Sequence, residues 1–139
     1  MNPYAAYQLE RPFATSRIDL LLALYDGAID RLENAIQLLQ AGDVHGARTR
    51  LTWCQLMIAE LAAGVRLDVV PDIGENVLRL YEFVSYQLSQ CEIAGLTGAL
   101  KVLEHLREGF EAIRAESIEM ERTGKIPGID SLHAVSKIA

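Results

Sequence analysis

The chain has 139 residues, a length typical of one domain. It carries 19 Asp and Glu against 13 scattered Lys and Arg, a net charge of −6, which argues against nucleic-acid binding because that needs a basic face. Mean hydropathy is high at +0.13, but the longest apolar run, residues 20–25, is far shorter than the roughly 20 residues that cross a bilayer. Residues 1–8 lack the basic and apolar regions of a signal peptide. We therefore expect a cytoplasmic protein without membrane insertion.

Two helices joined by a short turn are predicted for the first half of the chain. Apolar residues recur at alternating steps of four and three from Ile18 onward, which places them on one face of a helix. Ser16 and Asp19 resemble a capping box at its start, and Gly42 ends it. Asp43 fits the N-cap of a second helix with the same spacing. The short link requires the two helices to lie antiparallel.

Two more helices are predicted for the second half. Pro71 suits the start of a helix but not its interior, so a third helix is predicted over residues 72–91. Gly95 and Gly98 mark the next break. A fourth helix is then predicted over residues 99–122.

Almost no strand alternation occurs, so the sequence predicts an all-α fold, an antiparallel four-helix bundle over residues 16–122. We expect an extended N-terminal segment, residues 1–15, and a short C-terminal tail, residues 123–139. Within that tail, residues 130–138 could form one further short helix.

Three of the predicted helices carry more large apolar residues than one buried stripe needs. These are Leu20, Leu21 and Leu24 on the first helix, Trp53, Leu56 and Met57 on the second, and Leu78, Leu80 and Phe83 on the third. One interpretation is ordinary core, because a globular helix buries a stripe wider than a strict heptad seam. The other is an exposed apolar surface of the kind that holds another helix. We expect some of the nine to face outward.

The N-terminal segment is unusually aromatic for a tail. Pro residues argue against a helix there, yet it contains Tyr4, Tyr7, Leu9 and Phe13. A simple tail with Phe13 as a hydrophobic staple is one interpretation. The alternative that we favour is a segment that lies back on the bundle and covers apolar surface, since tyrosine has an apolar body and a polar tip.

No catalytic motif is found, so the sequence predicts no enzyme, no cofactor and no metal site. Metal sites in helix bundles use Glu-x-x-His pairs, which do not occur, and His45, His105 and His133 are expected at exposed or capping positions. A small cofactor-binding bundle enzyme is the rival hypothesis. It needs inward polar groups, for which only Tyr25 and Tyr81 are candidates, and both can serve as core tyrosines.

The remaining charged and sulfur-containing residues have ordinary explanations. Cys54 and Cys91 lie inside helical patterns without CxxC spacing, so we expect small buried hydrophobes. Asp26 and Asp30 are expected on a solvated face. The fourth helix is expected to show a solvated face with modest ion pairing, formed by Glu104, Arg107, Glu108, Glu111 and Arg114.

Two motifs suggest a family. The opening N-P-Y-x-x-Y at residues 2–7 and L-Y-D-G-A-I at residues 24–29, with Asn76 and Leu80-Tyr81 further on, resemble the flagellin-specific export chaperone family FliS. The similarity spans about residues 2–120. The paired motifs are fairly specific, whereas heptad stripes alone would match many helical bundles.

The resemblance implies a bundle that binds the disordered C-terminal segment of flagellin, prevents its premature polymerisation and delivers it to the flagellar type III export gate. It implies that Tyr4 and Tyr7 form a movable cover. It also makes the surplus apolar residues of the second and third helices the expected client-binding groove, namely Trp53, Leu56, Met57, Leu78, Leu80 and Phe83. The alternatives are another secreted client, or a homodimer in the absence of client.

Overall fold

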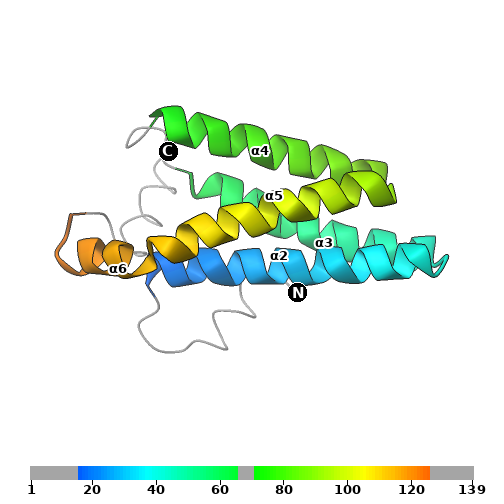
Figure 1. Cartoon of the computed structure of the whole chain (residues 1–139), viewed down its shortest axis with the longest axis horizontal. Helices are drawn as coiled ribbons and strands as arrows, with labels where there is room; N and C mark the ends of the chain where they lie inside the picture. Colours follow the sequence, from blue (N-terminus) through cyan, green and yellow to red (C-terminus); the bar gives the residue numbers. More distant parts are fainter. Residues whose placement is uncertain (1–15, 66–70, 126–139) are drawn as a thin grey trace.

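The computed structural model describes residues 16–65 and 71–125, and these form five helices and no strand (Figure 1). They are α2 (Arg17–Gln40), α3 (Val44–Ala63), α4 (Pro71–Gln90), α5 (Ile93–Ala112) and α6 (Arg114–Arg122). The predicted all-α bundle is confirmed. The N-terminal segment and the predicted helix over residues 130–138 lie outside the described residues.

The four long helices pack as a ring in which each contacts two neighbours. Helix α2 contacts α3 and α5, and α4 contacts the same two helices from the opposite side of the bundle. The α2–α3 and α4–α5 turns lie at the same end (Figure 1). Helix α6 lies at the other end, against α2. None of the described helices is long and apolar enough to span a membrane.

The caps of α2 and α3 form as predicted. The Ser16 side chain accepts a hydrogen bond from the Asp19 amide at 3.2 Å, and Asp43 accepts from the Gly46 amide at 2.9 Å. Gly42 has a φ of 85° and follows the end of α2, in a left-handed conformation that glycine adopts without steric cost. The Asp43 amide donates back to the Leu38 carbonyl, which closes a Schellman motif.

The turn between α4 and α5 differs from the prediction. Helix α5 begins at Ile93, so Gly95 and Gly98 lie inside it, and the break falls at Cys91, which takes a φ of 55°. The space at Gly95 is filled by the far end of the Gln87 side chain of α4, which would have to move if residue 95 carried a Cβ atom. Gly95 therefore admits a side chain of the neighbouring helix instead of ending a helix.

The predicted fourth helix is interrupted. Helix α5 ends at Ala112, Ile113 has a φ of −102° and a ψ of 8°, and α6 follows from Arg114. The far end agrees with the prediction, because α6 ends at Arg122 and Gly124 takes a φ of 78°. Neither Gly nor Pro stands at the break, and beyond it Arg114 and Glu121 make hydrogen bonds to the start of α2.

The core lies between the four long helices and is apolar. Fully buried members include Leu32, Met57, Leu96 and Leu103, and no charged residue is buried in the described part of the chain. Cys54 and Cys91 are both buried and free, which confirms their interpretation as small hydrophobes. The surplus leucines of α2 also face inward. Leu20 and Leu24 are buried and Leu21 is partly buried, and the three of the nine that are exposed, Leu56, Leu80 and Phe83, stand on α3 and α4.

Candidate functional site

The three candidate groove residues of α3 have different environments. Leu56 is 49% exposed, and Trp53 is half-buried. Met57 is completely buried and belongs to the core. A side chain without exposed surface cannot line an open binding surface, so Met57 contributes to stability and is removed from the candidate set.

The candidate residues of α4 do not form one surface. Leu80 and Phe83 are 37% and 42% exposed, whereas Leu78 is partly buried against the core. An α-helix turns about 100° per residue, so Leu78 and Leu80 point to opposite flanks of α4. Leu80 and Phe83, three residues apart, share one side.

Sequence reasoning missed the most exposed apolar residues of α4. Ile73 is 61% exposed and lies seven residues before Leu80, so Ile73, Leu80 and Phe83 form one side of the helix, which we call the α4 stripe. The next residue of this stripe, Gln87, packs against Gly95 of α5. The stripe therefore runs along the flank of α4 that leads to α5. Its spacing of seven and three is a signal that the sequence already contained.

Tyr25 of α2 and Tyr81 of α4 meet across the centre of the bundle. Their hydroxyl groups lie 2.5 Å apart, and both side chains are buried. The Phe110 ring of α5 packs on Tyr25 with a centroid separation of 5.7 Å. Burial raises the pKa of both tyrosines above its ordinary value. The hydroxyls satisfy one another, so this pair acts as a core polar contact between diagonal helices, as expected for core tyrosines.

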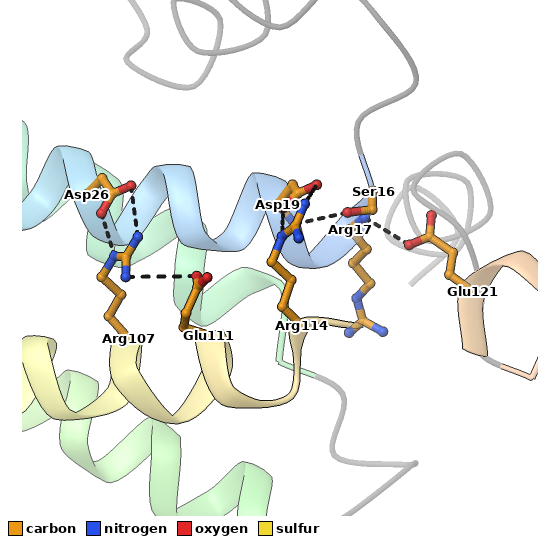
Figure 2. A network of polar contacts seen from close by, with 8 residues as sticks. All are labelled: Ser16, Arg17, Asp19, Asp26, Arg107, Glu111, Arg114 and Glu121. Carbon is orange, nitrogen blue, oxygen red and sulfur yellow. Dashed lines mark hydrogen bonds and ion pairs between the residues drawn. The ribbon is translucent and has the colours of Figure 1, made fainter. Parts of the chain in front are cut away.

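A network of ion pairs joins α2 to α5 and α6 (Figure 2). The Arg107 Nε of α5 donates to the Asp26 Oδ1 at 2.5 Å, and Arg107 also lies 3.9 Å from Glu111. The Arg114 Nε donates to the Asp19 Oδ1 at 2.6 Å, and its Nη2 donates to the Oδ2 at 3.2 Å. Charge-assisted hydrogen bonds to the carboxylates raise the pKa of both arginines.

These pairs agree with the expectation of a solvated face with modest ion pairing, and they show that the carboxylate partners lie on α2. Asp19 and Asp26 lie seven residues apart on α2, and their partners Arg107 and Arg114 lie seven apart in the reverse direction. Equal spacing with reversed order is what an antiparallel helix pair in a single register produces. The arginines of the predicted fourth helix therefore bridge to α2, and Asp26 is paired although it is exposed.

Glu121 of α6 contacts the start of α2. Its Oε2 accepts a hydrogen bond from the Arg17 amide at 2.9 Å. The first amides of a helix have no partner within the helix, so a carboxylate at this point serves as a cap that is remote in sequence. Figure 2 shows Glu121 and Arg114 approaching the first turn of α2 beside Ser16.

No group of three or more His, Cys, Asp or Glu residues that could hold a metal ion occurs within residues 16–65 and 71–125. His45 and His105 are exposed. His133, and the predicted cover residues Tyr4 and Tyr7, lie outside the described residues.

The described architecture, a bundle of long helices with an exposed apolar stripe, does not by itself assign a protein family, and comparison with known proteins supplies one. The sequence model of the family described as Flagellar protein FliS matches residues 1–117. The chain belongs to the FliS family. Among its relatives is the Flagellar secretion chaperone FliS of Bacillus subtilis (strain 168), which is 26% identical over 121 residues, covering 87% of this chain and 90% of the relative.

Membership confirms the resemblance seen in the two sequence motifs. FliS proteins are flagellar secretion chaperones and not enzymes, so the function of this chain is to bind a client instead of transforming a substrate. The exposed apolar residues of α3 and α4 are then the part of the described surface in which client binding is best sought.

Proposed function

We propose that this FliS protein binds the disordered C-terminal segment of flagellin in the cytoplasm, prevents its premature polymerisation and delivers it to the flagellar type III export apparatus. The observation that carries the proposal is the α4 stripe of Ile73, Leu80 and Phe83, exposed on a member of a secretion chaperone family. We propose Trp53 and Leu56 of α3, and Leu78 of α4, as further client contacts.

The chemistry of the stripe suits a client that folds on binding. Asn76 and Gln87 are uncharged and continue the spacing of the α4 stripe, and charged Arg79 lies at its edge, one turn before Phe83. A segment that is unfolded alone loses conformational entropy when it docks, and burial of apolar surface must offset that loss. Phe83 and Leu80 are large enough to serve as anchors.

Calorimetry with a synthetic peptide of the flagellin C-terminal segment tests the proposal. We expect a 1:1 complex whose heat capacity change on binding is negative, because apolar surface is buried. Phe83→Ser and Leu80→Ser should each weaken binding by about tenfold or more, which corresponds to roughly 1.4 kcal/mol. Val44→Ser is the matched control, because Val44 is 48% exposed but stands at the start of α3 and not on α4.

The single tryptophan of the chain gives a second readout. Trp53 is half-buried on α3, so a client that extends from the α4 stripe across α4 onto α3 should shift its fluorescence emission. Absence of any complex at tens of micromolar peptide would refute the proposed client. A tight complex that is equally insensitive to the Phe83 and Val44 substitutions would instead refute the assigned surface.

The role proposed for Tyr4 and Tyr7 is that of a movable cover over apolar surface. Deletion of residues 1–10 should therefore change the affinity for the flagellin peptide. An unchanged affinity would mean that this segment takes no part in binding. Light scattering of the protein alone and with flagellin separates client binding from self-association, the competing use of an exposed apolar patch.

A further inference from the structure

Helix α6 is attached to the bundle by few contacts. It spans nine residues, and none of them is buried. Isolated helices shorter than about 12–15 residues are marginal in water, so α6 depends on its contact with α2 to stay helical. Elements with few buried apolar contacts are the ones that open locally before the rest of a protein unfolds.

Two polar residues of α6 that contact α2 lie on the same side of α6. Arg114 and Glu121 are seven residues apart, which is nearly two turns. Arg114 makes two hydrogen bonds to the Asp19 carboxylate, and Glu121 accepts from the Arg17 amide. Both contacts fall on the first turn of α2, which Ser16 also caps through the Asp19 amide.

The Glu121 carboxylate is electrostatically favourable for α2 and unfavourable for α6. It stands in the last turn of α6, where the negative end of the helix dipole disfavours a carboxylate. The start of α2 is the positive end of a helix and favours the same carboxylate. The attraction that holds Glu121 in place therefore exists only while α6 is docked.

Ile113 separates α6 from the core. Its backbone leaves the helical conformation, no side chain caps the start of α6, and the Ile113 side chain is 47% exposed. Were α5 continuous, the spacing of the ion pairs would place Glu116, not Glu121, opposite Arg17. The break thus changes the register and lets α6 follow a separate path.

We propose that α6 is a detachable latch on the first turn of α2, held by Arg114 and Glu121 and opening at Ile113 while the four long helices stay packed. Release unfolds residues 114–122 and removes one cap from α2. The latch gives this end of the bundle an equilibrium of its own, to which the charged contacts contribute beside the half-buried Ile118 and Met120 of α6.

Hydrogen exchange of the full-length protein, read by mass spectrometry, tests the latch. In Arg114→Gln and in Glu121→Gln, amides of residues 114–125 should exchange about fivefold faster or more than in the wild type, as expected for loss of a charge-assisted contact. Amides of the buried part of α3 should exchange at the wild-type rate. The matched controls are Arg122→Gln and Glu119→Gln, which break an ion pair confined to α6.

Ionic strength separates a latch from ordinary fraying. Raising salt from about 0.1 M to about 1 M shortens the Debye length from about 10 Å to about 3 Å. This should speed exchange of residues 114–125 in the wild type and have a smaller effect in Arg114→Gln, where the Asp19 ion pair is already lost and only the Glu121 contact remains to be screened. Equal exchange in the Arg114 and Arg122 variants, or faster exchange of α3 together with α6, would overturn the proposal. None of these measurements involves a client, so they stand independently of the proposed function.

Discussion

Helix α2 contacts α3 through buried apolar residues and contacts α5 and α6 through ion pairs. The first kind of contact supplies stability, and the second determines how the helices are aligned. Toward α3, α2 presents small and apolar residues, and Ala28 and Ala35 of α2 are completely buried in the central cluster together with Ala47 of α3. The Cys54 thiol of α3 donates to the Ala28 carbonyl at 3.4 Å, which reflects how closely the two backbones approach. Toward α5 and α6, α2 uses the carboxylates of Asp19 and Asp26 on a solvated rim.

The difference follows from what each interaction contributes. Burial of apolar surface stabilises by about 25 cal/mol per Å² but is not directional. Solvated ion pairs contribute about 0–1 kcal/mol each, yet their spacing specifies one register. The α2–α3 side should therefore dominate the free energy of unfolding, and the α2–α5 side should determine alignment.

The largest expected effect is loss of a core side chain. Leu32 is completely buried, so Leu32→Ala should lower the free energy of unfolding by about 2–5 kcal/mol in urea titration. Leu56→Ala removes the same atoms from a residue that is 49% exposed and should cost below about 1 kcal/mol. Similar losses for the two variants would contradict the described burial.

The tyrosine pair should show strong coupling in a double-mutant cycle. Tyr25→Phe leaves the Tyr81 hydroxyl buried without its partner, and Tyr81→Phe does the reverse, so each should cost about 1–3 kcal/mol. The double substitution removes both hydroxyls and should cost less than the sum of the single losses. Additive losses would show that the hydroxyls do not interact in solution.

Stability should fall in alkali. Burial raises the pKa of the Cys54 thiol from 9.0 to about 12, so between these values the unfolded chain loses a proton that the folded chain keeps. The contribution of this thiol is complete below pH 9 and declines by about 1.4 kcal/mol per pH unit above it. Urea titrations from pH 8 to about pH 10 should show a shallower slope in Cys54→Ala, and an unchanged slope would argue against a buried thiol.

The smallest expected effect concerns the ion pairs. Asp26→Asn and Arg107→Gln should each cost below about 1 kcal/mol, and the cost should vanish at high salt. Asp30→Asn, on the same helix at an exposed position, is the control. A loss as large as that of Leu32→Ala would mean that the polar side of α2 supplies stability, contrary to the comparison above.

The sequence predicted a helix end correctly where the capping residue lies within a few residues of the backbone groups that it caps. Ser16, Gly42 and Asp43 act on backbone groups within a few residues, so their pattern was sufficient. The prediction was wrong at Gly95, because the local sequence does not distinguish a glycine that ends a helix from a glycine that makes space for a side chain of a neighbouring helix. It was also wrong at Ile113, where the competing contacts come from α2, about a hundred residues earlier.

The candidate site was only partly predictable. Leu20 and Leu24 of α2 belonged to the same surplus as Leu80 and Phe83 of α4, yet the first two are buried and the last two exposed. The spacing of apolar residues shows which of them lie on the same face of a helix. It does not show how many neighbouring helices will bury that face.

The sequence by itself determined the all-α class, the antiparallel order and, through its N-P-Y-x-x-Y and L-Y-D-G-A-I motifs, the FliS family. These properties depend on residues close together in the chain. Only the tertiary structure decided that Met57 belongs to the core and that Glu121 caps α2. It also decided that Ile73, Leu80 and Phe83 are exposed together on the flank of α4 that leads to α5. Exposure and remote capping depend on which helices become neighbours, and that outcome is set by packing of the whole chain.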